Sequence, residues 1–183
     1  MSAPRAVIGG VVAMLLVAAC GSAAPEASPT RPMVVDGGTS ASVTVSASTK
    51  MICEHEAQGD IAKALGTDIT RPLAPTWVDH EYSCRYVYGA GAMRLSVKQL
   101  GDAPATRRYF DGLVRRLGRS GSLAGLGQGA FTTARNSVVV RKDDKVLVVD
   151  VRDLPTTFGT PPDTRANVAI TVAATIMGCW TGE

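Results

Sequence analysis

This chain has few histidines and a small net charge. The first feature limits the catalytic sites that it can form, and the second limits the partners that it can bind. With two histidines, His55 and His80, a Ser-His-acid triad would have to recruit one of them as its base. The 19 basic and 16 acidic residues leave a net charge of +3, too near neutrality to indicate a nucleic-acid-binding protein. Hydrophobic residues at 45% and charged residues at 19% are typical of a globular chain rather than a disordered one.

The apolar run near the N-terminus is too short to span a membrane and instead has the pattern of an export signal. Arg5 is followed by uncharged, mostly apolar residues 6–19, whereas a spanning helix needs about 20 apolar residues. Residues 17–20 read Val-Ala-Ala-Cys and match the bacterial lipobox, in which the cysteine sulfur takes the diacylglycerol. The sequence therefore predicts a lipid anchor at Cys20 and a location on the outer face of the cytoplasmic membrane. The alternative is an ordinary cleaved signal with a chance cysteine.

Residues 21–50 are mostly Ser, Thr, Ala, Pro and Gly, and this composition predicts a flexible linker. A chain of this length would hold a domain on the order of 30 Å from the lipid surface. Residues 42–46 alternate Ser, Val, Thr, Val and Ser, so an edge strand is the alternative there. We thus divide the chain into a signal peptide (1–19), a lipidated cysteine with its linker (20–50) and a globular domain (51–183).

Periodicity predicts a helix, a hairpin and a second helix in the first half of the domain. Residues 60–65 have a helical pattern that ends at Gly66. Residues 82–88 and 93–97 alternate in polarity on either side of a glycine-containing turn, which predicts a β-hairpin. An amphipathic helix follows and ends at Gly118. Its core-facing stripe consists of Phe110, Leu113, Val114 and Leu117.

The second half of the domain has a similar order of elements. After a glycine-rich stretch over 121–129, the apolar runs 137–141 and 146–151 flank a polar turn and predict a second hairpin. Residues 164–177 lack strand alternation and predict a last helix, although several are β-branched. Together these elements predict an α+β two-layer sandwich: a four-stranded antiparallel sheet from two hairpins, with all helices on one face.

Three cysteines fall in the predicted domain, and an exported domain meets conditions that favour a disulfide. Cys53, Cys84 and Cys179 allow three pairings, each of which leaves one residue over. We favour Cys53–Cys84, which would join the first helix to the first strand. Closing a loop of about 30 residues contributes roughly 3–4 kcal/mol in the chain-entropy model. Cys179 would then lie buried near Trp180, and the functional alternative for it is a reactive thiol.

The sequence contains no complete motif for catalysis, nucleotide binding or metal binding. Residues 125–129 are glycine-rich but open a strand, whereas a dinucleotide-binding loop opens a helix. Residues 118–121 read Gly-Arg-Ser-Gly, one residue short of a nucleophile elbow. Residues 55–59 lack the second histidine of the zinc-peptidase motif. Asp79 and His80 are adjacent and would point to opposite faces of a strand. In a loop they could converge with Glu54 or Glu56 to bind a metal, but we favour surface polar residues and predict no metal and no other cofactor.

Five arginines give the middle helix a basic side opposite its apolar stripe. Arginine suits phosphate groups, and an anionic membrane attracts positive charge, so these residues are candidates for contacts with an anionic ligand. The alternative is a solvated charged face. The five residues are Arg107, Arg108, Arg115, Arg116 and Arg119.

Several short motifs together resemble a known family. A cysteine opens a helix that ends Ala-Leu-Gly at 64–66, a second cysteine lies in Cys-Arg-Tyr at 84–86, and residues 125–130 read Gly-Leu-Gly-Gln-Gly-Ala. With the lipobox and the Ser/Thr/Pro tether, this layout resembles the actinobacterial, mycobacterial-type small cell-envelope lipoproteins of the DUF3558-like kind. The resemblance covers most of residues 51–180. It implies a location in the cell envelope and no catalytic residues.

The expected function is non-enzymatic, namely a membrane-anchored accessory domain that binds a ligand or a partner in the cell envelope. A sheet face left bare by one-sided helices would hold an apolar ligand or a protein. Envelope lipids, glycans and proteins are the candidate partners. The alternative is an envelope hydrolase that uses His55 or His80 with nearby carboxylates, which requires a cleft that joins these groups.

Replacing the lipobox cysteine tests the predicted anchor. We expect the N-terminal peptide of the mature protein to carry acyl chains at Cys20, and Cys20→Ala to abolish both this mass and membrane fractionation, because the thiol is the acceptor of the lipid. Mass spectrometry of the mature N-terminus makes the measurement. An unacylated wild-type N-terminus, or unchanged fractionation of the variant, contradicts the prediction.

Overall fold

The computed structural model describes residues 44–71 and 73–180. The predicted signal peptide, Cys20 and most of the predicted linker lie outside these residues. Ser40–Glu183 group as one compact unit. None of the helices in the described residues is both long enough and apolar enough to cross a membrane. The helices are α1 (Ala47–Lys50), the 3₁₀ helix η1 (Met51–Cys53), α2 (His55–Leu65), α3 (Ala103–Leu117) and α4 (Arg165–Cys179).

A single antiparallel sheet forms the centre of the domain, with its seven strands in the order β1-β2-β3-β7-β6-β5-β4. Two consecutive antiparallel runs, β1 to β3 and β4 to β7, join where β3 pairs with β7. Strands β8 and β9 form a separate small ribbon. The strands are β1 (Thr76–Val78), β2 (Glu81–Tyr88), β3 (Gly91–Gln99), β4 (Arg119–Leu123), β5 (Gly129–Thr133), β6 (Val138–Lys142), β7 (Lys145–Asp150), β8 (Thr157–Phe158) and β9 (Asp163–Thr164).

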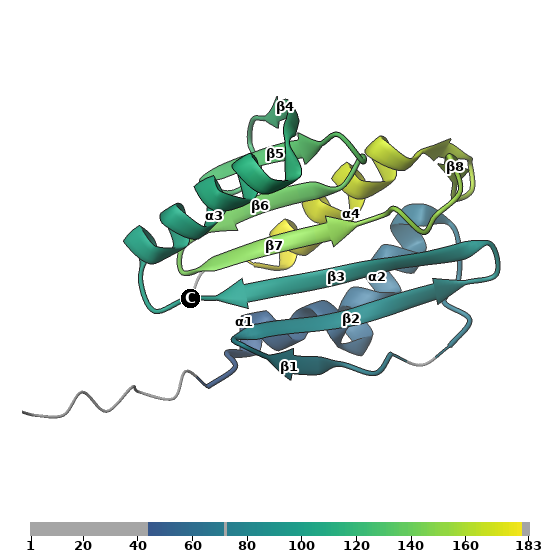
Figure 1. The fold of residues 1–183 in the computed structure, drawn as a ribbon. Helices are drawn as coiled ribbons and strands as arrows, with labels where there is room; N and C mark the ends of the chain where they lie inside the picture. The colour runs from purple at the N-terminus through teal and green to yellow at the C-terminus, as the bar shows by residue number, and fades with distance from the viewer. Residues whose placement is uncertain (1–43, 72, 181–183) are drawn as a thin grey trace, which may run out of the picture. The chain divides into compact units, whose positions relative to one another are not determined.

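Helices cover both faces of this sheet (Figure 1). Helices α1, α2 and α4 lie on one face, and α3 crosses the other face over β5, β6 and β7. The larger core lies beneath α2 and α4 and contains the fully buried Tyr86, Leu95 and Leu147. The smaller core lies beneath α3. It consists of Phe110, Leu113, Phe131, Val139 and Val146.

The predicted four-stranded sheet with helices on one face is therefore wrong in strand number and in layering. Strand β1 has only three residues, and β4 reads Arg-Ser-Gly-Ser-Leu, so neither shows an apolar alternation that predicts a strand. Strands β6 and β7 are apolar on both faces, and both faces must be covered to keep these residues from water. Helix α3 covers the second face, although Leu117 at its end remains 42% exposed.

The elements with a strong period are confirmed. Helix α2 ends at Gly66 in the left-handed conformation, and α4 begins after Thr164, whose hydroxyl accepts a hydrogen bond from the Asn167 amide. Both predicted hairpins form, as β2 with β3 and β6 with β7. In each case hydrophobic spacing and a local stop signal agree, which is the condition under which local sequence determines local structure.

The predicted Cys53–Cys84 disulfide is confirmed, and it joins η1 to β2 with the two Cα atoms 5.9 Å apart. Beside it, the Tyr86 hydroxyl donates to the Ile52 carbonyl at 2.7 Å. Burial raises the pKa of the Tyr86 phenol far above its usual range, so the hydroxyl keeps its proton at any physiological pH. The disulfide and this hydrogen bond therefore hold the helical segment 51–53 against the sheet.

The folded structure reaches into the segment that composition assigns to the linker. Ser46 caps α1, and its amide donates to the Gln99 side chain at 3.0 Å. The buried Thr49 hydroxyl donates to the same oxygen at 3.0 Å, and Gln99 donates in turn to the Thr44 carbonyl at 3.4 Å. A buried side-chain amide at the end of β3 thus attaches residues 44–49 to the domain.

The end of α2 is closed by a tight contact with the loop between β8 and β9. The Thr160 amide donates to the Leu65 carbonyl at 2.8 Å. Gly66 has φ +58°, and a Cβ at this position would overlap the Thr160 carbonyl oxygen. Only glycine satisfies both the backbone conformation and the close approach.

Alanine substitutions at two glycines of the α2 region test this contact. We expect Gly66→Ala to lower the free energy of unfolding by about 2–4 kcal/mol, since it adds left-handed strain and a steric overlap. Gly59→Ala is the control, because Gly59 lies within α2 with open space around its Cα. This change should raise stability by about 0.5–1 kcal/mol. Urea unfolding measures both variants, and equal midpoints would contradict the assignment.

Candidate functional site

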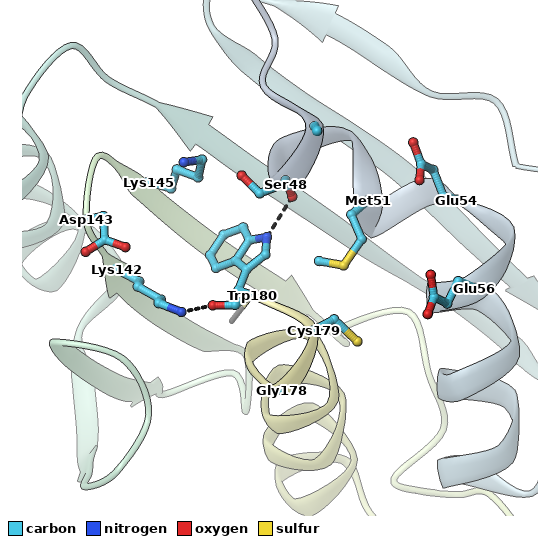
Figure 2. A pocket seen from close by; sticks show the side chains of 11 residues that line it. Ser48, Met51, Glu54, Glu56, Lys142, Asp143, Lys145, Gly178, Cys179 and Trp180 are labelled. Carbon is cyan, nitrogen blue, oxygen red and sulfur yellow. Dashed lines mark hydrogen bonds between the residues drawn. The ribbon is translucent and has the colours of Figure 1, made fainter. Parts of the chain in front are cut away.

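A cavity of about 600 Å³ opens where three segments distant in sequence meet. These segments are the helical stretch from α1 to the start of α2, the turn between β6 and β7, and the end of α4. Figure 2 shows Met51 and Trp180 lying between two groups of charged side chains. The lining residues are Ala47, Ser48, Met51, Glu54, Glu56, Lys142, Asp143, Lys145, Gly178, Cys179 and Trp180.

Trp180 fixes the geometry of the cavity because it bonds to both neighbouring walls. Its indole Nε1 donates to the Ser48 carbonyl at 2.6 Å, and its own carbonyl accepts from the Lys142 ammonium. The Trp180 side chain is almost wholly buried, and its polar N–H has a hydrogen-bond partner. Trp180 thereby joins the end of α4 to α1 on one side and to the end of β6 on the other.

The two sides of the cavity differ in charge compensation. On the strand side, the buried Lys145 ammonium pairs with Asp144 at 2.7 Å, and Asp143 lies beside Lys142 in sequence. On the helix side, Glu54 and Glu56 are exposed and form no ion pair within residues 44–71 and 73–180. The cavity therefore has an apolar centre, a nearly neutral strand wall and a negative helix wall.

Cys179 lines the cavity as a free, partly exposed thiol, which corrects the prediction that it is buried as a small hydrophobe. Its Sγ donates to the Asp60 carboxylate at 3.8 Å. Burial raises the pKa of the Cys179 thiol, and the charge of Asp60, its hydrogen bond and the charge of Glu56 raise it further. Glu56, which belongs to the negative helix wall, and Asp60 thus both disfavour the thiolate form of Cys179.

A second, smaller cavity of about 180 Å³ lies where the end of α2, the start of α4 and the β8–β9 ribbon meet. Leu65, Phe158 and Val168 contribute to its lining. Its volume is below the roughly 300–1,000 Å³ typical of small-molecule sites. The larger cavity is therefore the candidate binding site.

Neither His55 nor His80, the two candidate catalytic histidines, lines either of these cavities. His55 is exposed at the start of α2, whereas His80 lies in the turn between β1 and β2 and stacks on Trp77 at 5.9 Å between ring centres. Asp79 and His80 both have positive φ in that turn rather than lying on a strand. Among the described residues, no group of three His, Cys, Asp or Glu side chains is placed to hold a metal ion.

The five arginines predicted as anionic-ligand contacts lie together at the surface on and just after α3. Arg119 begins β4, and its guanidinium lies 5.4 Å from the ring centre of Phe131. Arg116 lies similarly over Tyr109 at 5.8 Å. None of these five residues lines the cavity, and α3 lies on the face of the sheet opposite α1, α2 and α4 (Figure 1), so the domain presents two separate surfaces of functional interest.

The glycine-rich segment after α3 forms a structured hairpin connection between β4 and β5. A Cβ at Gly127 would overlap the Arg141 carbonyl oxygen, and φ at this residue is +55°. Gln128 accepts from the Arg141 guanidinium at 2.9 Å and donates to Asp143 at 2.9 Å. The glycines thus let this turn pack against the end of β6.

Comparisons with protein-family models, curated proteins and solved structures find no match to this chain. The sequence predicts Cys179 as buried near Trp180, residues 142–145 as a hairpin turn and Glu54 or Glu56 as carboxylates near the histidines, but it does not predict that they line one cavity. The acidic pair Glu54 and Glu56 is visible in the sequence, but no local pattern indicates that it faces the β6–β7 turn.

The raised pKa of Cys179 predicts slow alkylation. Because a higher pKa leaves a smaller thiolate fraction, reaction with iodoacetamide near pH 8 should be slower than that of an unstructured cysteine, and it should accelerate as pH rises. Asp60→Asn should increase the rate at this pH by removing a negative charge and a hydrogen-bond acceptor. Mass spectrometry follows the reaction. If the rates of wild type and Asp60→Asn are equal across the pH range, the electrostatic assignment is wrong.

Proposed function

We propose that this chain is a lipid-anchored, non-enzymatic protein of the cell envelope whose domain binds a small ligand in the cavity beside Trp180. The lipobox at residues 17–20 and the Ser/Thr/Pro-rich segment after it support the anchor and the location. The observation that carries the binding function is the cavity of about 600 Å³, which has the size of a ligand site.

The lining suggests a ligand with an apolar body and a polar or cationic group. Met51 offers a flexible, polarizable thioether, which adapts to apolar surfaces of different shape. Glu54 and Glu56 have uncompensated negative charge at the opening. A cationic or hydrogen-bond-donating group beside them would be favoured, whereas an anionic group there would be repelled. This site replaces the bare sheet face that the sequence predicts as the binding surface.

A bulky side chain at Gly178 tests the cavity. Gly178 lines the cavity, and a Cβ at this position meets nothing within 4 Å. The Phe side chain in Gly178→Phe therefore fills part of the cavity without a backbone clash. Gly59→Phe is the matched control, because Gly59 is also an exposed helical glycine with open space but lies outside the cavity.

The full chain, extracted from membranes in mild detergent, is measured by native mass spectrometry and by titration with the uncharged dye Nile red. In wild type and in Gly59→Phe we expect one non-covalent adduct and saturable dye binding. In Gly178→Phe we expect the dye to bind at least about tenfold more weakly, a loss of about 1.4 kcal/mol in binding free energy. Absence of both the adduct and saturable binding, or equal binding by all three proteins, would refute the proposal.

A further inference from the structure

The outer side of α3 is a second candidate binding surface, and it is rich in exposed arginines. Arg107, Arg108, Arg115 and Arg116 are all exposed, and none forms an ion pair within the described part of the chain. Arg108 and Arg115 are seven residues apart in sequence, so they lie on the same side of the helix, with Gly112 between them. The helix therefore presents uncompensated positive charge on its outer side.

Two aromatic residues of α3 itself, Tyr109 and Phe110, contact one of these arginines and two neighbouring cations. The Arg116 guanidinium lies 5.8 Å from the centre of the Tyr109 ring, and Lys98 approaches the same ring at 5.9 Å. Arg141, from β6, lies 6.0 Å from the centre of the Phe110 ring. Cations ordered over aromatic rings lose less side-chain entropy when they bind, so they are better prepared for an anionic partner than freely moving side chains.

The acidic residues of α3 do not neutralise this surface. Asp102 is engaged as the N-cap, where its carboxylate accepts from the Ala105 amide at 2.6 Å. Asp111 is exposed among the arginines and forms no ion pair within residues 44–71 and 73–180. One free carboxylate against four arginines leaves a net positive patch, which we call the α3 patch and define as Arg107, Arg108, Arg115 and Arg116.

The point where the chain enters the domain lies close to the start of α3. Gln99, at the end of β3, bonds to both Thr44 and Ser46, and α3 begins at Ala103 soon afterwards. A lipid at Cys20 would thus connect to the domain beside the helix that carries the patch. Stable membrane attachment commonly combines a lipid chain with a basic surface.

We propose that the α3 patch docks the domain onto the anionic phospholipid headgroups of the membrane. Four exposed guanidinium groups match a surface of phosphates in charge and in hydrogen-bond geometry. In this arrangement the lipid anchor attaches the protein to the membrane, and the α3 patch determines which side of the domain faces the bilayer. The cavity, lined by other elements, is left free for its ligand.

The test uses the mature chain from residue 20 onward with Cys20→Ser, which keeps the compact unit Ser40–Glu183 and removes acylation. Co-sedimentation is measured with vesicles of phosphatidylcholine alone and with about one third phosphatidylglycerol. Four-arginine variants at the α3 patch replace the residues by Gln or by Lys. The control variant replaces an equal number of exposed cations elsewhere by Gln: Lys50, Lys63, Arg71 and Arg135.

We expect binding to the anionic vesicles only, and its loss in about 0.5 M NaCl, where surface charges are screened. Each removed arginine should weaken partitioning about fivefold, so the α3 Gln variant falls to the level of neutral vesicles while the Lys variant retains most binding. The control variant should lose much less than the α3 Gln variant. Circular dichroism establishes that all variants are folded.

Two results would overturn the docking surface. If the α3 Gln variant and the control Gln variant lose vesicle binding equally, the net charge of the protein, rather than the α3 patch, controls binding. If about 10 mM inorganic phosphate at constant ionic strength displaces the protein from the vesicles, the patch is a discrete anion-binding site instead of a membrane-docking surface. Because the protein tested carries no lipid, failure here is distinct from failure of the proposed acylation at Cys20.

Discussion

The attachment of the helical segment 51–53 to β2 is the constraint on which the rest of the domain depends. The Cys53–Cys84 disulfide and the hydrogen bond from Tyr86 to the Ile52 carbonyl hold that segment over the sheet. Because α1 and η1 are each only a few residues long, neither would be stable without such tertiary contacts. Their placement in turn positions Ser48 to accept from Trp180 and Met51 to line the cavity. The disulfide and the hydrogen bond from Tyr86 thus support both the short helices over the sheet and the candidate site.

Local sequence predicts the strongly periodic elements of this fold, but it does not predict their layering. Helix α2 with its stop at Gly66, the hairpins β2–β3 and β6–β7 and the disulfide all follow from spacing and residue type. The position of α3 follows instead from β6 and β7, whose continuous valine-rich runs require cover on both faces. That signal is present in the sequence, yet interpreting each strand as half of a two-layer sandwich overlooks it. Strands β1 and β4 carry no periodic signal, since neighbouring strands rather than their own side chains hold them in the sheet.

The candidate site was less predictable than the fold, for a physical reason. Its walls come from residues 47–56, 142–145 and 178–180, which only the finished tertiary structure brings together. Short motifs detect chemistry that is local in sequence, and no local chemistry is present here. The arginines of α3 are different, because helical spacing alone places them on one side of the helix.

The two edges of the sheet have a further consequence for association between copies of this domain. An open sheet exposes unpaired backbone groups along its outer strands, and such edges can pair with those of a neighbour. Here one edge is β1, with three residues, and the other is β4, where the register shifts between Arg119 and Gly121. Neither of these two outermost strands offers a long, regular row of donors and acceptors. These two outermost strands are therefore poor templates for edge-to-edge pairing with another copy of the domain, whereas longer and more regular ones would favour self-association.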